Sequence, residues 1–212
     1  MNINKHLILL FSVLFFLFAV SVSSGCFRKN ESDVKSVVRN ELDQLKNLDS
    51  ETTQKYIPYT ELFPDATENT DLTDEINETF SLFFRKFNYK ISDVIVGTAN
   101  HSATVSVKLT TIDSKVLARD FKAELLRTQI TESAQAQKGN IKDSSRSLEA
   151  HYLILNHLLN TNDYDTAETD CNIQLVNTGN DKKEKWKIQR TNSLEDDLVG
   201  GLIADLADTD IL

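Results

Sequence analysis

The spacing of apolar residues changes repeatedly along the chain, and this change constrains the fold more than any other feature. Apolar residues recur three or four positions apart, as on one face of a helix, and then alternate with polar residues, as on a half-buried strand. The helical spacing covers five stretches: Asp33 to near Pro58, Thr73 or Asp74 to Phe87, Asp113 or Ser114 to Leu126, about 148–160, and Leu194 to Leu206. We therefore expect helices first, then a β-hairpin, more helices, a second hairpin and a helical tail.

The alternating stretches are typical of two β-hairpins. Residues 89–96 and 103–109 flank one short turn, and residues 171–177 and 184–189 flank a turn rich in Asn, Gly and Asp. Strands joined by such turns pair antiparallel. The sequence therefore predicts an α+β fold in which residues 33–212 form a single domain, with helices packed on one face of an antiparallel sheet.

Four segments are expected to interrupt or weaken these elements. Residues 58–73 have the composition of a loop, and residues 131–147 have that of an exposed loop or a frayed helix. The acidic stretch from Asp163 to Asp170 lacks the glycine that a calcium loop needs at its sharp turn, so we expect a solvated loop. The Gly200–Gly201 pair should weaken the tail helix by about 1 kcal/mol for each glycine.

The N-terminus resembles a secretory signal peptide. Lys5 precedes an apolar run from Leu7 to Val22, and three small residues end the segment at Gly25. The run has sixteen positions, fewer than the roughly 20 apolar residues that a membrane-spanning helix needs. Residues 1–25 are therefore expected to be removed rather than to stay in the membrane.

The cysteine that follows resembles the acceptor residue of the bacterial lipobox, a pattern of one aliphatic residue, two small residues and a cysteine. Ser23 stands where that pattern usually has Leu, and Val22 comes one position earlier. The resemblance implies cleavage between Gly25 and Cys26, transfer of diacylglycerol to the Cys26 thiol, and a lipidated tether over residues 26–32. Two acyl chains, such as two palmitates on the diacylglycerol, anchor a protein stably to a membrane. The implied partner is the lipid bilayer, at the extracytoplasmic face of the cell membrane.

Two alternatives to this anchor remain open, namely an ordinary signal peptide followed by an incidental cysteine, and an uncleaved signal anchor. If Cys26 is acylated, Cys171 is the only thiol left, so no internal disulfide can form and stability depends on the core. The net charge of −9 disfavours nucleic acid and anionic membrane surfaces as partners, because like charges repel.

The sequence offers little support for catalysis. It contains no nucleophile elbow, no phosphate-binding glycine loop and no paired-cysteine zinc motif. His151 and His157 are six residues apart, which places them on different faces of a helix, so no metal site is expected. We expect no catalytic residue and no cofactor, and only Asp113, Tyr89 and Tyr152 are candidates for acid–base work by residue type.

Several segments resemble a group of lipoproteins from low-GC Gram-positive bacteria that are built on the nuclear-transport-factor-2-like fold. The segments are Phe87–Ile91, Ala103–Val107, Thr110–Asp113 and Trp186–Ile188, followed by Leu194 and Gly200–Gly201. The resemblance spans roughly residues 33–202, and the helical stretch after Asp113 is longer than in the simplest members. It implies a curved sheet that wraps a long helix in a cone, often with a pocket at the wide end. It implies no reaction, because this fold serves isomerases, hydratases, adaptors and assembly domains alike.

A pocket of that kind could be lined by Phe84, Tyr89 and Trp186, although the same side chains could fill the core instead. The expected function is a non-enzymatic interaction or small-ligand-binding module held at the cell surface, with a cell-surface protein or a small ligand as partner. Two other functions stay open: an acid–base enzyme of the isomerase or dehydratase type, and a structural or assembly domain.

Overall fold

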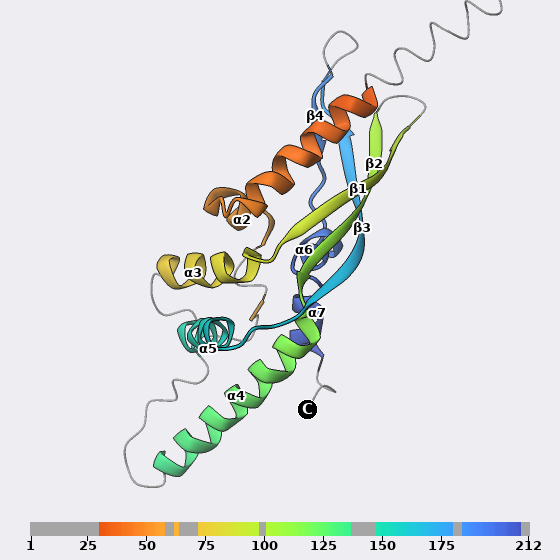
Figure 1. The fold of residues 1–212 in the computed structure, drawn as a ribbon. Coiled ribbons are helices and arrows are strands. Elements are labelled where there is room, and N and C mark those ends of the chain that lie inside the picture. The colour runs from red at the N-terminus through yellow and green to blue at the C-terminus, as the bar shows by residue number, and fades with distance from the viewer. Residues whose placement is uncertain are drawn as a thin grey trace, which may run out of the picture.

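The computed structural model describes residues 30–57, 62–63, 72–97, 101–136, 147–179 and 184–208. A helix over residues 30–46, here called the N-terminal helix, is followed by α2 (Ser50–Tyr56), α3 (Thr73–Phe84), β1 (Asn88–Val96), β2 (Ser102–Ile112), α4 (Ser114–Ala136), α5 (Leu148–Thr161), β3 (Thr166–Asn177), β4 (Trp186–Ile188), α6 (Asn192–Leu198) and α7 (Leu202–Ala207). The expected order of helices and hairpins, and the α+β class, are confirmed (Figure 1).

The four strands form one antiparallel sheet in the order β1-β2-β3-β4. β2 and β3 pair along their whole length, from Ser102 opposite Val176 to Ile112 opposite Thr166. The long strands curve and twist together, and the helices gather on one side of them (Figure 1). The two central strands, β2 and β3, are adjacent in space. They are far apart in the sequence because α4 and α5 connect them.

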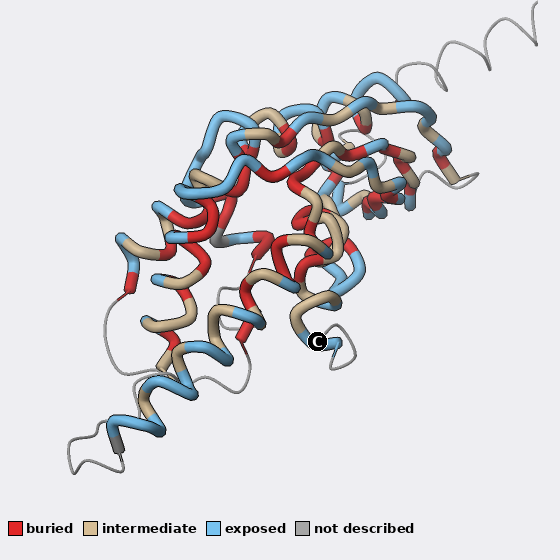
Figure 2. The backbone as a smooth tube through the Cα atoms, turned by 60° about the horizontal axis from the view of Figure 1, so that its bottom comes forward, coloured by how far each residue is buried: buried red, intermediate tan, exposed pale blue. Residues whose placement is uncertain are grey.

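The two faces of the sheet differ in burial because side chains alternate along a strand. On β2, Val105 and Val107 are buried, whereas Thr104 and Ser106 on the other face are only partly buried. Figure 2 shows the buried positions concentrated where helices and sheet meet. The buried apolar side chains of both layers belong to one hydrophobic cluster, so the helices and the sheet share a core.

A β-bulge in β1 keeps apolar side chains on the core face, although they stand at odd-numbered positions before the bulge and at even-numbered positions after it. The register with β2 shifts between Ile91 and Asp93. Before the shift Tyr89 and Ile91 face the core, and after it Val94 and Val96 do. The odd-to-even change in the apolar positions of the sequence is the local cause of this bulge.

The first expected helix is two helices, which corrects the prediction of one helix from Asp33 to near Pro58. The N-terminal helix ends at residue 46, and Leu48 has a positive φ of 62°. Asp49 then caps α2, because its carboxylate accepts hydrogen bonds from the Thr52 N–H at 2.9 Å and the Thr52 hydroxyl at 2.6 Å.

Two further element boundaries differ from the expectation. α4 continues past Leu126 as a largely exposed helix to Ala136, so the helical alternative holds for residues 131–136, and residues 137–146 lie outside the described residues. The predicted acidic loop is also partly wrong, since β3 begins at Thr166 and carries the exposed Glu168 and Asp170. Backbone pairing with β2, which local composition does not reveal, extends this strand.

The expected tail helix is divided at Gly200. The Gly200 N–H donates to the Asp197 carbonyl at 3.0 Å and the Gly201 N–H to the Asp196 carbonyl at 2.8 Å, with Gly200 at a φ of 66°. This is a Schellman termination. The glycine pair therefore ends α6 and starts α7 instead of weakening one helix. Within the described part of the chain, no helix is both long and apolar enough to cross a bilayer.

Candidate functional site

The expected lipidation site precedes the first described element. Gly25 and Cys26 lie outside the described residues, and the described part of the N-terminal helix starts at Asn30, four positions after Cys26. The cleavage and acylation of this segment remain predictions.

The structure brings two of the three residues of the expected pocket near each other and places the third apart. Phe84 and Trp186 are buried in the core, with exposed fractions of 1% and 6%. Phe84 stacks edge-on against Phe87, whose ring lies 6.5 Å from that of Tyr89. Phe84 and Tyr89 therefore belong to one aromatic neighbourhood, and Phe84 serves as packing within it.

Trp186 lies at the other end of the sheet from Tyr89. Through the strand pairing, Tyr89 is level with Leu109 and Thr169, whereas Trp186 is level with Asn177. Eight positions along β3 separate the two levels, which is roughly 26 Å at about 3.3 Å per residue. Trp186 therefore does not share a pocket with Tyr89.

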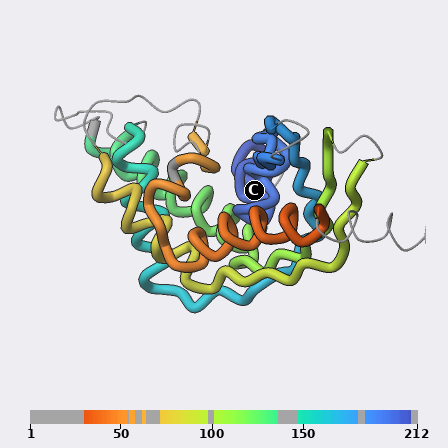
Figure 3. Tube along the Cα trace, turned by 90° about the horizontal axis from the view of Figure 1, so that it is seen from above, coloured from red at the N-terminus to blue at the C-terminus, as the bar shows by residue number. Residues whose placement is uncertain are grey.

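Tyr89 instead lines a cleft of about 300 Å³ between the N-terminal helix and β1. The helix runs beside β1, as Figures 1 and 3 show. The lining residues are Lys35, Arg39, Asp43 and Lys46 from the helix and Asn88, Tyr89 and Ile91 from β1. We call this feature the cationic cleft, because three of its side chains are positive and one is negative.

The spacing of the charged residues explains why one helix supplies all four charges. Lys35, Arg39, Asp43 and Lys46 are four, four and three positions apart, which aligns them on one side of a helix. The apolar residues Val34, Val38, Leu42 and Leu45 have the same spacing and are buried. The apolar stripe packs the helix onto the core, and this packing turns the charged stripe toward β1.

Tyr89 is held in place by the helix. Its hydroxyl donates to the Asp43 carboxylate at 2.6 Å and lies 3.4 Å from the Arg39 carbonyl oxygen. Desolvation, as the larger cause, and the hydrogen bond to Asp43, as the next, raise the pKa of Tyr89 to about 12. The phenol is therefore protonated at neutral pH and acts as a hydrogen-bond donor.

The cations of the cleft differ in how they are engaged. Lys46 donates to the Asn88 side-chain oxygen at 2.8 Å. The side chains of Lys35 and Arg39 make no hydrogen bond or ion pair with any other residue that the structure describes. Arg39 is exposed and Lys35 is half-buried, so both can reach a ligand. The arrangement can bind an anion without first breaking an internal ion pair.

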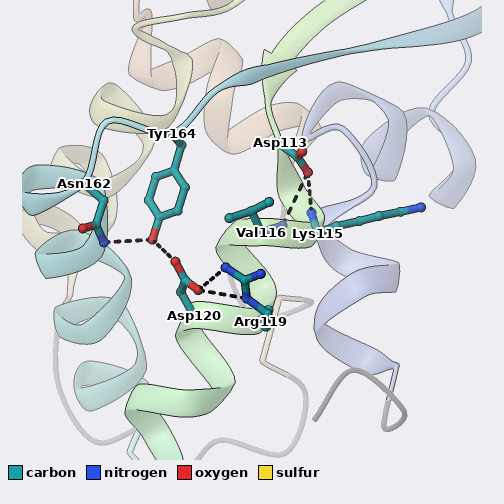
Figure 4. Close-up of polar contacts among 7 residues, drawn as sticks. All are labelled: Asp113, Lys115, Val116, Arg119, Asp120, Asn162 and Tyr164. Atoms are coloured by element: carbon teal, nitrogen blue, oxygen red, sulfur yellow. Dashed lines mark hydrogen bonds and ion pairs between the residues drawn. The ribbon is translucent and has the colours of Figure 1, made fainter.

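A second polar cluster joins α4 to the segment before β3 (Figure 4). The Tyr164 hydroxyl donates to the Asp120 carboxylate at 3.2 Å and accepts from the Asn162 amide at 3.1 Å. Arg119 binds the other Asp120 oxygen through two nitrogens at 2.9 and 3.1 Å. Burial raises the pKa of Tyr164. Because these groups satisfy one another, the cluster links two elements and leaves little capacity for a ligand.

The other acid–base candidates have structural positions. The Asp113 carboxylate accepts from the Lys115 and Val116 N–H groups at 3.2 and 3.4 Å (Figure 4), so it caps α4. Tyr152 is fully buried, with its ring edge-on to that of Phe63 at 5.4 Å. Of the three candidates, Tyr89 is the one that lines the cationic cleft.

Sequence reasoning missed the cationic cleft, although a signal was present. The net charge of −9 argues against anionic partners for the molecule as a whole, yet it does not describe local charge. Lys35, Arg39 and Lys46 repeat at helical spacing beside the buried stripe, and this pattern could have indicated a positive helix face. The facing strand could not have been identified from that pattern.

A comparison of the chain with protein-family models, curated proteins and solved structures found no match.

Proposed function

We propose that this chain is a lipid-anchored, extracytoplasmic domain that binds a small anionic ligand in the cationic cleft and does not act as an enzyme. The observation that carries the proposal is the cleft itself, in a chain of net negative charge, with two cations, Lys35 and Arg39, that have no ion-pair partner among the described residues. Its volume of about 300 Å³ is at the lower end of the range for small-ligand sites.

The anchor part of the proposal rests on Cys26 and its distance from the domain. Cys26 and Asn30, the first described residue of the N-terminal helix, are four positions apart, which spans at most about 14 Å when extended. An acylated Cys26 would hold this helix, and hence the cleft, close to the outer surface of the membrane.

Detergent phase partitioning tests the anchor. We expect the full chain expressed in a Gram-positive host to enter the detergent phase, with a diacylglyceryl mass on the peptide that begins at Cys26. Cys26→Ala should stay in the aqueous phase, because no thiol accepts the lipid. Equal partitioning of both proteins into water, with a cut near Gly25, would show an ordinary secreted protein.

Thermal unfolding in the presence of small anions tests the cleft. A ligand that binds only the folded state raises the melting temperature. We expect such a rise for wild type and for Lys90→Gln, which removes an exposed positive charge of β1 outside the cleft, and a much smaller rise for Arg39→Gln. An equal rise for all three proteins would show that the anions act elsewhere.

An acid–base enzyme is the second candidate, because Tyr89 and Asp43 form a short hydrogen bond in the cleft. The raised pKa of Tyr89 keeps the phenol protonated, so it cannot serve as a base at neutral pH and is a weak acid. Binding without turnover is therefore the better-supported function. Assembly through the sheet is a third possibility, which a monomer in sedimentation at micromolar concentration would exclude.

We also propose that the domain has the nuclear-transport-factor-2-like cone fold. A curved antiparallel sheet with helices on one side supports it. The pair α4 and α5 between β2 and β3 is then an addition to the simplest form of that fold.

A further inference from the structure

We propose that the ligand group held in the cationic cleft is a phosphate monoester dianion, an inference that rests on the proposed anion-binding function. A free phosphorylated metabolite and a lipid with a terminal phosphate would present the same group. The recognition chemistry is therefore the same for both sources.

The charge of the lining favours a dianion. Three cations and one carboxylate give the cleft a net charge of two positive. A phosphate monoester carries about −1.5 to −2 at pH 7, whereas a phosphodiester or a single carboxylate carries only one negative charge. A phosphate monoester thus balances the charge of the lining with a single group.

The two unengaged cations are placed to converge on one group. Lys35 and Arg39 are four residues apart, about 6 Å along the helix axis, and both line the cleft. The planar guanidinium can bind two phosphate oxygens at once, and the ammonium adds a point charge. A phosphate between these two side chains gains two charged partners.

Asp43 sets the orientation of the ligand. One of its oxygens is engaged by Tyr89, and its negative charge repels a phosphate from the middle of the cleft toward the Lys35–Arg39 end. The rest of the ligand then lies along Tyr89 and Ile91. Asp43 therefore acts as an orienting residue, because its repulsion is strongest for the most highly charged part of the ligand.

Calorimetric titration of the full chain in a neutral detergent with glycerol 3-phosphate tests this assignment. We expect saturable binding that weakens about tenfold in Arg39→Gln and in Lys35→Gln, because each loses a charged hydrogen bond. Lys90→Gln is the matched control and should bind as wild type does. Affinity should fall as the pH drops below about 6, where the monoester becomes a monoanion.

Asp43→Asn gives an independent readout that does not depend on loss of function. The amide oxygen can still accept from Tyr89, while the repulsion is gone. Affinity for glycerol 3-phosphate should therefore rise, and affinity for acetate should rise by a smaller factor, because the repulsion removed is proportional to the charge of the ligand. Unchanged affinity for both anions would exclude the role assigned to Asp43.

A vesicle arm distinguishes the two sources of the phosphate. Binding of soluble glycerol 3-phosphate supports a free metabolite, and binding only to phosphatidylcholine vesicles that contain phosphatidic acid supports a lipid. Preference for a dicarboxylate such as succinate in wild type, lost in Arg39→Gln, would overturn the phosphate assignment and leave anion binding intact. If no anion binds in a manner that depends on Lys35 or Arg39, both proposals fail.

Discussion

At the scale of single residues, Tyr89 shows how a helix and a strand together change the chemistry of one side chain. Its hydroxyl is partly desolvated and donates to Asp43, which raises its pKa to about 12 from an ordinary value of about 10. The fold favours the protonated form, so the stability that this shift contributes is present below about pH 10 and is lost as the pH rises toward 12. In a pH titration followed by ultraviolet absorbance, the part of the tyrosinate signal that is absent from Tyr89→Phe should appear with a midpoint near pH 12.

The matched control is Asp43→Asn, which keeps a hydrogen-bond acceptor and removes the negative charge. The Tyr89 midpoint in this variant should lie below that of wild type, because the carboxylate no longer disfavours tyrosinate. A Tyr89 midpoint near 10 in wild type would contradict the hydrogen bond to Asp43.

At the scale of secondary-structure elements, Gly200 decides how the chain turns from α6 into α7. Its φ of 66° is costly for any residue with a Cβ, and a Cβ there would overlap the Thr111 hydroxyl of β2. Gly200→Ala should therefore lower the free energy of unfolding by more than the roughly 1–2 kcal/mol of a left-handed residue alone. Urea unfolding followed by circular dichroism measures this change.

Gly201→Ala separates the cost of backbone strain from the cost of steric overlap with a neighbouring side chain. Gly201 has a φ of 90°, but a Cβ there meets no atom closer than 3.7 Å. We expect Gly201→Ala to be destabilising by backbone strain only, and hence less so than Gly200→Ala. The opposite ranking would show that the contact between Gly200 and Thr111 is not close.

At the scale of the whole molecule, the shared core predicts that distant elements unfold together. Phe84 of α3 and Trp186 of β4 belong to the same hydrophobic cluster, and Trp186 is the only tryptophan. Phe84→Ala should lower the free energy of unfolding by about 3–5 kcal/mol. A domain with one shared core is expected to unfold cooperatively, so Trp186 fluorescence and circular dichroism should shift to the same lower urea concentration.

Leu126→Ala is the control for this experiment, since Leu126 is 46% exposed on α4 and should change stability by no more than about 0.5 kcal/mol. If Trp186 fluorescence keeps its transition in Phe84→Ala while circular dichroism shifts, the helical layer and the β4 region unfold independently.

The helix and strand order was predictable because it depends on local spacing. The apolar stripe of Thr73–Phe84 and the alternation of Ser102–Ile112 each repeat within a few residues, so periodicity alone identifies them. The break at Leu48 was not predictable in this way. Leu45 and Leu48 fit one continuous helical stripe, and only the positive φ and the Asp49 cap reveal that a second helix starts.

Local spacing also determined which residues of the N-terminal helix are buried and which are charged, because both stripes repeat within the helix. Which side chains meet across the sheet depended on strand register and on helix packing, which join positions more than forty residues apart. Register placed Trp186 far from Tyr89, and packing brought Asp43 to Tyr89 and formed the cationic cleft. The spacing of apolar residues determines which side chains are buried. Which distant segments come together depends on the strand register and packing that give the whole chain its lowest free energy.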